Sequence, residues 1–211
     1  MSIDKRAVAR DLLSIRAVFL RPEEPFTWAS GIQSPVYCDN RLILTAPDVR
    51  DRIENALAEC VKEKYPTCEA LMGTSTAGIA HAAIAAHMLG LPMGYVRSGA
   101  KDHGRNNRIE GAVTKGEKVV VVEDLISTAG SCVETADALR EAGCEVLGIV
   151  SIFTYNMQKG FDRLAAANLV NASLTDFDAL TEEAESSGYI APGVRARLLR
   201  FRDNPSDPGW M

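Results

Sequence analysis

Two adjacent acids, Glu123 and Asp124, directly follow a run of four valines at positions 119–122. A continuous β-branched run of this kind predicts a strand that is buried on both faces of a sheet. Ligands of open α/β sheets gather at the carboxyl ends of strands, and paired carboxylates there are costly unless something uses them. They can accept hydrogen bonds from vicinal hydroxyls or approach a hydrated magnesium ion.

A turn of small and hydroxyl-bearing residues comes next, Ser127-Thr128-Ala129-Gly130-Ser131. Small side chains let backbone N–H groups converge on an anion, and the N-terminus of a following helix adds a favourable partial charge. Diol-binding acids beside a phosphate-binding turn describe a site for ribose 5-phosphate. Taken singly, Ser131 is compatible with a helix cap and the acids with a solvated strand end, whereas their occurrence in this order favours the site.

The spacing excludes two other phosphate sites. The chain lacks the GxxxxGK[ST] pattern of a P-loop and the GxGxxG pattern of a dinucleotide site at this position.

A long polar segment over residues 98–114 is a second candidate for chemistry. Between Arg97 and Arg108 the chain carries five basic residues against the single acid Asp102, namely Arg97, Lys101, His103, Arg105 and Arg108. Loops of this length in compact domains are usually lids or disordered. The whole chain has a formal net charge of -5, which argues against nucleic acid or anionic lipid as partners. The basic segment therefore indicates a small anionic ligand, with a solvated surface loop as the alternative.

The stretch VVVVEDLISTAGS at 119–131 resembles the signature of the type I phosphoribosyltransferases. The resemblance implies that Glu123 and Asp124 hold the ribose hydroxyls of phosphoribosyl diphosphate, and that residues 127–131 hold its 5-phosphate. The donor-binding residues implied within the signature are Glu123, Asp124, Leu125, Ile126, Ser127, Thr128, Ala129, Gly130 and Ser131.

AKDHG, preceded by a strand-end arginine, resembles the catalytic loop of the orotate phosphoribosyltransferases, and the flap sequence PFTWASGIQSPVYCDNR is similar to theirs. This resemblance implies that Arg97, Lys101 and His103 bind the diphosphate, and that Lys101, His103 and Asp124 are catalytic. It also implies a homodimer whose lid, residues 98–114, reaches into the neighbouring active site. Magnesium is expected through the diphosphate and ribose hydroxyls, with no direct protein ligand, and Ser127 is expected to contact orotate.

This chain departs from the family where a cation for the orotate carboxylate is expected. It has Ala29 in the flap, Thr76-Ala77 after a strand, and Thr154 after the strand that follows the signature. Arg41 and Arg108 are the candidate substitutes, and a surface ion pair with Asp39 is the alternative for Arg41. Backbone N–H groups of residues 30–34 and the Ser127 hydroxyl are further alternatives.

Two other functions stay open. A purine-type phosphoribosyltransferase, specific for adenine or xanthine, would share the ribosyl chemistry. A non-catalytic regulator that senses phosphoribosyl diphosphate would keep the fold, but the chain shows no added DNA-binding domain or basic face.

The elements that must position these residues alternate along the chain. We predict an open, mostly parallel α/β sheet flanked by helices, with a small N-terminal flap or hood. Strands are expected at 69–72, 92–96, 118–122, 145–153 and 168–174, with a turn from Asp124 to Ser131. Helices are expected at 4–20, 47–64, 78–89, 132–142, 180–187 and 192–202, and residues 26–44 should be extended and turn-rich.

The chain of 211 residues reads as a single domain. We divide it into an N-terminal helix and flap (1–45), an α/β core (46–205) and a frayed tail (206–211). The residues His81 and His87 lie in an alanine-rich helix and should be packing or surface residues. Trp28 and Tyr37 are either walls for a base or packing aromatics.

Composition sets the cellular context that we expect. No apolar run approaches the length of a membrane span, and no secretory apolar segment is present, so the protein is expected in the cytoplasm. The five cysteines are odd in number and scattered, which predicts reduced thiols rather than a disulfide framework or a zinc site.

Overall fold

The computed structural model describes residues 3–27, 31, 33–99 and 108–211. Its centre is a sheet of six strands in the order β10-β9-β8-β5-β6-β7. The strands are β5 (Ala70–Thr74), β6 (Met93–Val96), β7 (Ile109–Glu110), β8 (Lys118–Ile126), β9 (Glu145–Thr154) and β10 (Asn171–Asp176). All neighbours pair in parallel except β6 and β7, which are antiparallel. The predicted open, mostly parallel sheet is confirmed.

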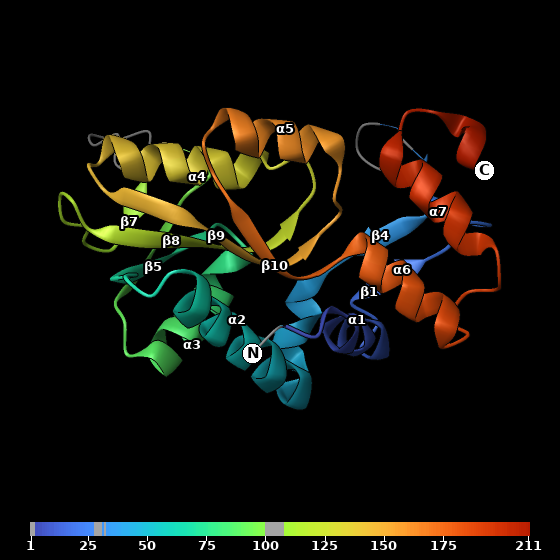
Figure 1. Ribbon diagram of the computed structural model, residues 1–211, viewed down its shortest axis with the longest axis horizontal. Helices are drawn as coiled ribbons and strands as arrows, with labels where there is room; N and C mark the ends of the chain where they lie inside the picture. Colours follow the sequence, from blue (N-terminus) through green and yellow to red (C-terminus); the bar gives the residue numbers. More distant parts are fainter. Residues whose placement is uncertain (1–2, 28–30, 32, 100–107) are drawn as a thin grey trace.

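The valine run of β8 explains why helices cover both faces of this sheet. Val120 and Val122 pack with α2 (Pro47–Lys64) and α3 (Gly78–Leu89), whereas Val119 and Val121 pack on the other face, with α4 (Gly130–Glu141). Successive side chains of a strand point to opposite faces, so four consecutive valines bury apolar surface in two separate cores. Figure 1 shows α4 and α5 (Gln158–Ala166) on one side of the sheet and α2 and α3 on the other.

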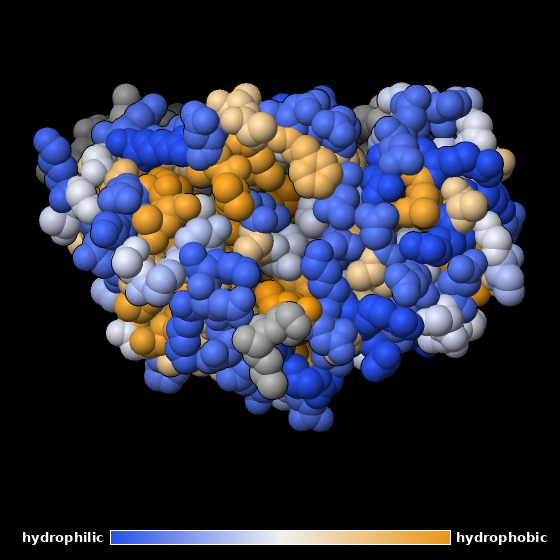
Figure 2. All heavy atoms as spheres, viewed as in Figure 1, coloured by the Kyte–Doolittle hydropathy of each residue, from blue (hydrophilic) through white to orange (hydrophobic). Residues whose placement is uncertain are grey.

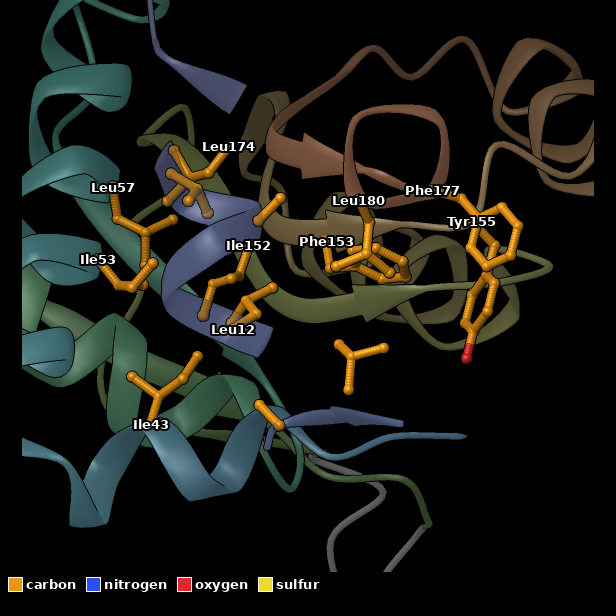
Figure 3. Close-up of a cluster of buried hydrophobic side chains, with 14 of the residues drawn as sticks. Leu12, Ile43, Ile53, Leu57, Ile152, Phe153, Tyr155, Leu174, Phe177 and Leu180 are labelled. Carbon is orange, nitrogen blue, oxygen red and sulfur yellow. The ribbon is translucent and has the colours of Figure 1, made fainter. Parts of the chain in front are cut away.

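A second layer of packing joins the two ends of the chain. Figure 1 shows α1 (Lys5–Ser14) beside α6 (Phe177–Ser186), with α7 (Val194–Asp203) next to α6. Arg6 and Arg10 of α1 both pair with the buried Glu183 of α6, at 2.9 and 2.8 Å. The helices α1 and α6 also share an apolar core with β9. Figure 3 shows part of it, namely Leu12, Ile152, Phe153, Phe177 and Leu180.

The flap consists of two small antiparallel ribbons. The strand β1 (Val18–Leu20) pairs with β4 (Val36–Cys38), and β2 (Phe26–Thr27) pairs with β3 (Gln33–Ser34). A short 3₁₀ helix, η1 (Asn40–Thr45), then leads into α2. The N-terminal flap or hood predicted from the sequence is confirmed.

The N-terminal helix is shorter than predicted. It begins after the cap Asp4 and ends at Ser14, and Arg16 takes a left-handed φ of 57°. The prediction that it continues to Leu20 was wrong, because residues 18–20 hydrogen-bond to β4 instead. The pairing of Val18 with Cys38 is a contact between residues far apart in sequence, and helical periodicity does not register such a contact.

Boundaries around the signature and the lid also differ from prediction. The strand β8 does not end at Val122 but continues to Ile126, because Leu125 and Ile126 pair with β9. The predicted turn from Asp124 therefore begins only at Ser127, and α4 begins two residues earlier than expected. Part of the predicted lid, Ile109–Glu110, is an edge strand.

The helix α5 was missed, although its sequence, QKGFDRLAA, places apolar residues at helical spacing. It covers a hollow of about 530 Å³ between α5 and β10, and Figure 2 shows apolar side chains gathered under α5. Phe161, which is among the residues that line this hollow, is 50% exposed.

The prediction of a frayed tail was wrong. Trp210 is only 2% exposed and packs edge-on against Phe201, with ring centroids 5.5 Å apart. Arg197 donates to the carbonyl oxygen of Trp210 and to that of Pro22, so the tail is tied to the flap. The polar composition of residues 203–209 led to the prediction of a frayed tail, although Trp210 anchors it.

The cysteines are free in the structure, as predicted, with Cys60, Cys132 and Cys144 buried. Within the described ranges, no helix combines the length and the apolar character that crossing a membrane requires.

Candidate active site

A polar cleft of about 430 Å³ opens where β5 and β8 end. Four segments line it: residues 38–41 of the flap and η1, residues 75–77 between β5 and α3, residues 123–125 of β8, and the turn leading into α4. Because β5 and β8 are parallel neighbours, their carboxyl ends meet at one edge of the sheet. The sheet topology therefore brings together segments that are far apart in sequence.

The acidic pair forms one wall of the cleft. Glu123 is only 4% exposed, while Asp124 is half-buried. The Ser131 hydroxyl donates to Glu123 Oε2 at 2.9 Å, and the Asp124 N–H donates to Oε1 at 3.1 Å. Burial, and then the charge of Asp124, raise the pKa of Glu123 to about 8. Without ligand, Glu123 thus carries a proton near neutral pH. Hydrogen-bond donors that approach the carboxyl group would favour loss of this proton.

The backbone at Asp124 is fixed from the flap side. Asn40 is 1% exposed and donates from Nδ2 to the Asp124 carbonyl oxygen at 2.7 Å. The Cys38 thiol in turn donates to Asn40 Oδ1 at 3.3 Å. Burial raises the pKa of this thiol well above its usual range, with the charge of Asp124 contributing. This chain of contacts links the flap to the acidic wall.

The turn between β8 and α4 has the form of an anion cradle. Ala129 adopts a left-handed φ of 58°, and α4 begins at Gly130. The N–H groups of the first turn of a helix have no intrahelical acceptor and point toward the helix N-terminus. Such a terminus, preceded by hydroxyl side chains at Ser127 and Thr128, suits a phosphate group.

The helix α5 supports this turn from behind. A Cβ added at Gly160 would lie 2.6 Å from the Ser127 carbonyl oxygen, so only glycine allows the helix to approach so closely. Arg163, one turn later and half-buried, comes near Gly130: a Cβ added there would lie 2.8 Å from Arg163 Nη1. A cation at the positive end of α4 adds to the attraction for an anion.

The third segment, residues 75–77, is held against β6. The Ser75 hydroxyl and N–H both donate to the Val96 carbonyl oxygen, at 2.7 and 3.2 Å, and the Ser75–Thr76 peptide bond is cis. A Cβ added at Gly78 would lie 2.5 Å from the Val122 carbonyl oxygen, so α3 starts in close contact with β8. The backbone of this segment therefore faces the acidic pair across the cleft.

Behind it, α3 is fixed to α2 by a buried pair. His81 Nδ1 lies 2.5 Å from Glu54 Oε1, and both side chains are fully buried. Burial raises the pKa of Glu54, and His81 opposes that rise. His81 is thus a packing residue and His87 is an exposed surface residue, and both outcomes are among those predicted.

The cleft brings together most, but not all, of the signature residues. Glu123, Asp124, Leu125, Ser127 and Ser131 line it. Ile126 is 3% exposed and lines the hollow under α5 instead, as does the other side of Ser127. Thr128, Ala129 and Gly130 form the turn itself.

The predicted lid residues lie elsewhere or outside the described residues. Arg97 Nε lies 3.1 Å from Glu110 Oε1, and Arg108 donates from Nε to the Arg97 carbonyl oxygen at 3.0 Å. Neither arginine is among the described residues that line the cleft. Lys101 and His103, like Trp28 and Ala29 of the flap, lie outside the described residues. Tyr37 packs against Phe26, with ring centroids 5.5 Å apart.

Sequence reasoning missed Asn40, Gly160 and Arg163. Asn40 acts on a carbonyl group 84 residues away, so no local pattern marks it. Gly160 and Arg163 were missed with the helix that carries them, although the amphipathic pattern of α5 was a usable signal. In the part of the chain that the structure describes, no three His, Cys, Asp or Glu residues group as metal ligands would.

A family model described as "Phosphoribosyl transferase domain" matches residues 41–179. An orotate phosphoribosyltransferase from Bacillus cytotoxicus is 56% identical over 207 residues, which cover 98% of this chain and 99% of that protein.

Two solved structures extend the comparison. An orotate phosphoribosyltransferase from Aeropyrum pernix matches with a TM-score of 0.75 at 29% identity, covering 87% of this chain and 99% of that one. The UMP synthase of Leishmania donovani matches with a TM-score of 0.81 at 25% identity, covering 94% of this chain but 42% of that longer one.

Proposed function

Because this chain belongs to the phosphoribosyltransferase family, and to its orotate phosphoribosyltransferases by full-length identity, we propose how its cleft carries out their reaction. The reaction joins orotate and phosphoribosyl diphosphate to give orotidine 5′-phosphate and diphosphate, a step of pyrimidine biosynthesis. The observation that carries the proposal is the shared cleft, in which a buried acidic pair adjoins the anion cradle at the start of α4.

The donor fits this arrangement by charge and hydrogen bonding. The 5-phosphate would occupy the turn of residues 127–131, where free N–H groups, hydroxyls and the helix N-terminus favour an anion. The ribose hydroxyls would then donate to Glu123 and Asp124. Such donors favour the ionised carboxylate, so donor binding would draw the proton from Glu123.

Transfer breaks the bond between ribose C1 and the diphosphate oxygen, forms a bond from C1 to the orotate ring nitrogen N1, and releases the proton that N1 carried. The electron pair of the breaking bond leaves with the diphosphate, and the ribose passes through an oxocarbenium-like state. The carboxylates of Glu123 and Asp124 can stabilise this positive character, while cations stabilise the departing group.

The cations that we assign to the departing diphosphate are Arg97, Lys101 and His103 on or beside the lid. An imidazole has an ordinary pKa near neutrality, so His103 can also donate a proton to the diphosphate. The antiparallel pairing of β7 with β6 anchors the C-terminal end of the lid next to Arg97 and so supports this assignment.

Magnesium fits the donor set of the cleft. Asp39 and Asp124 both line it, and carboxylates can approach a hydrated magnesium ion. We expect the ion to be held by oxygens of the diphosphate and the ribose hydroxyls, with no direct protein ligand. When bound, the ion offsets the charge of the diphosphate as it leaves.

We further propose a homodimer with a shared lid, and a cytoplasmic location. The family resemblance of the AKDHG segment supports the dimer. The free cysteines support a reducing compartment.

The acceptor is tested by assaying orotate, adenine and xanthine separately with phosphoribosyl diphosphate and magnesium. We expect orotate to be consumed, with diphosphate formed in equal amount, and no comparable purine turnover. Purine turnover without orotate turnover would overturn the proposal, and binding of the donor without any turnover would favour a regulator.

A further inference from the structure

Orotate differs from uracil by one carboxylate, and the acidic lining of the cleft repels that negative charge. Three acids line the cleft, Asp39, Glu123 and Asp124. A carboxylate entering among them is repelled unless a cation is fixed close by. The positions Thr76, Ala77 and Thr154, near the ends of β5 and β9, supply none.

We infer that Arg41 is the cation that binds the orotate carboxylate and so sets the preference for a carboxylated base. The inference rests on the proposed function and deepens it. Of the described residues that line the cleft, Arg41 is the single one with a positive side chain.

The geometry of Arg41 leaves it able to bind a second carboxylate. Its Nε and Nη2 donate to the two oxygens of Asp39, at 2.6 and 2.8 Å. A guanidinium has five N–H donors, so three remain, including both on Nη1, for which the described residues provide no partner. The side chain is 64% exposed, so those donors are accessible from the cleft.

Asp39 holds the guanidinium in place. Its carboxylate also accepts from the Arg41 backbone N–H at 3.2 Å, within the cap of η1. The hydrogen bond and charge of Asp39, with a contribution from Asp124, raise the pKa of Arg41 further, so the group stays charged. A guanidinium oriented in this way can present its remaining edge to a planar carboxylate without loss of side-chain freedom on binding.

The other arginine proposed from the sequence, Arg108, does not compete. Arg108 donates to the Arg97 carbonyl oxygen and approaches Glu134 at 3.6 Å, away from the cleft lining. Arg41 lies in η1, on the flap side of the cleft, and the acidic pair and the 5-phosphate turn form other parts of the lining. The structure therefore distinguishes between alternatives that the sequence left open.

The test compares two nucleotides that differ by the carboxylate alone, orotidine 5′-phosphate and uridine 5′-phosphate. Dissociation constants of both are measured by calorimetry for the wild type and for Arg41→Gln. We expect the wild type to prefer orotidine 5′-phosphate, and Arg41→Gln to reduce that preference roughly 10- to 100-fold, the range for a lost hydrogen bond between charged groups. The affinity for uridine 5′-phosphate should change little.

A matched control is Arg52→Gln. Arg52 binds Asp11 through the same two nitrogens, at 2.9 and 2.5 Å, but lies outside the cleft. This variant should keep the full preference. Equal loss in both variants would mean a general structural effect and would overturn the inference.

A double variant tests whether Arg41 contacts the orotate carboxylate directly or only neutralises the charge of Asp39. If Arg41 binds the carboxylate directly, Asp39→Asn/Arg41→Gln stays as unselective as Arg41→Gln. Recovery of the preference in the double variant would overturn direct binding. A weaker affinity for diphosphate, with the nucleotide preference intact, would assign Arg41 to the leaving group instead.

Failure of the inference is distinguishable from failure of the proposed function. If the wild type neither consumes orotate nor prefers orotidine 5′-phosphate, the proposed function fails. If the wild type does both and Arg41→Gln keeps the preference, only the role of Arg41 is overturned.

Discussion

Glu123 occupies a position that suits ligand binding but makes the stability of the unliganded protein depend on pH. Its side chain is 4% exposed and lies beside Asp124, and its pKa is raised to about 8. An ordinary glutamate, as in the unfolded chain, titrates near pH 4.5. Between these values the folded state holds a proton that the unfolded state has lost. The stability that this proton provides is fully present below pH 4.5 and is lost as pH rises through 8.

We therefore expect Glu123→Gln to gain stability relative to the wild type as pH rises. The difference in unfolding free energy should grow by about 2 to 4 kcal/mol between pH 5 and 8, since one pKa unit corresponds to about 1.4 kcal/mol. Urea unfolding at both values measures it. Glu141→Gln, at an exposed position at the end of α4, is the control. Parallel pH dependence of Glu123→Gln and the wild type would contradict the prediction.

At the scale of elements, the position of the phosphate turn depends on α5. The turn has no partner strand beyond Ile126, and its support is the close contact between Gly160 and the Ser127 carbonyl oxygen. A helix can approach a loop this closely only where it lacks a side chain. The position of a loop that binds substrate is thus determined by an element from a later part of the chain.

Replacing this glycine tests the dependence. Gly160→Ala places a Cβ 2.6 Å from the Ser127 carbonyl oxygen, so the turn or the helix must shift. We expect KM for phosphoribosyl diphosphate to rise about 10- to 100-fold, because small displacements of binding groups are costly. Steady-state kinetics with both substrates measures the change.

The neighbouring exposed residue provides the control for this experiment. Lys159→Ala alters the same helix without entering the contact, and it should leave both KM values close to wild type. A folded Gly160→Ala protein with an unchanged KM for the donor would show that the turn does not depend on α5.

At the scale of the whole molecule, the tail completes the fold. Trp210 closes the core around α7 by packing on Phe201, and Arg197 joins the tail to Pro22 of the flap. We expect a chain ending at Gly209 to lose about 3 to 5 kcal/mol of unfolding free energy, the range for removing a large buried aromatic. Denaturant unfolding measures the loss. Removal of Met211 alone, which is 59% exposed, should change stability little.

The proposed dimer with a shared lid also belongs to this scale. Lys101→Ala should lower turnover more than it weakens orotate binding, because the lysine acts on the departing diphosphate. If the lid serves the neighbouring site, mixing Lys101→Ala with Asp124→Asn protomers should restore activity, since a hybrid dimer contains one intact site. Restoration of about a quarter of wild-type activity is the statistical expectation for random exchange. No restoration after exchange is demonstrated would contradict the shared lid.

The sequence by itself determined the parts of this protein that depend on neighbouring residues. The valine run specified a buried strand, because alternate side chains had to be apolar on both faces. The acids and the small-residue turn were contiguous, so Glu123, Asp124, Ser127 and Ser131 could be assigned to one site before the fold was known. Full-length relatives agree with the phosphoribosyltransferase assignment.

The tertiary structure alone decided what depends on distant residues. Whether Val18 belonged to a helix or a strand was decided by its partner Cys38, and the tail was ordered by its contact with Phe201. Likewise, no local pattern could choose between Arg41 and Arg108, because that choice depends on which side chain faces the cleft. Local interactions select an element, whereas the contents of a site are set by where the sheet brings distant segments together.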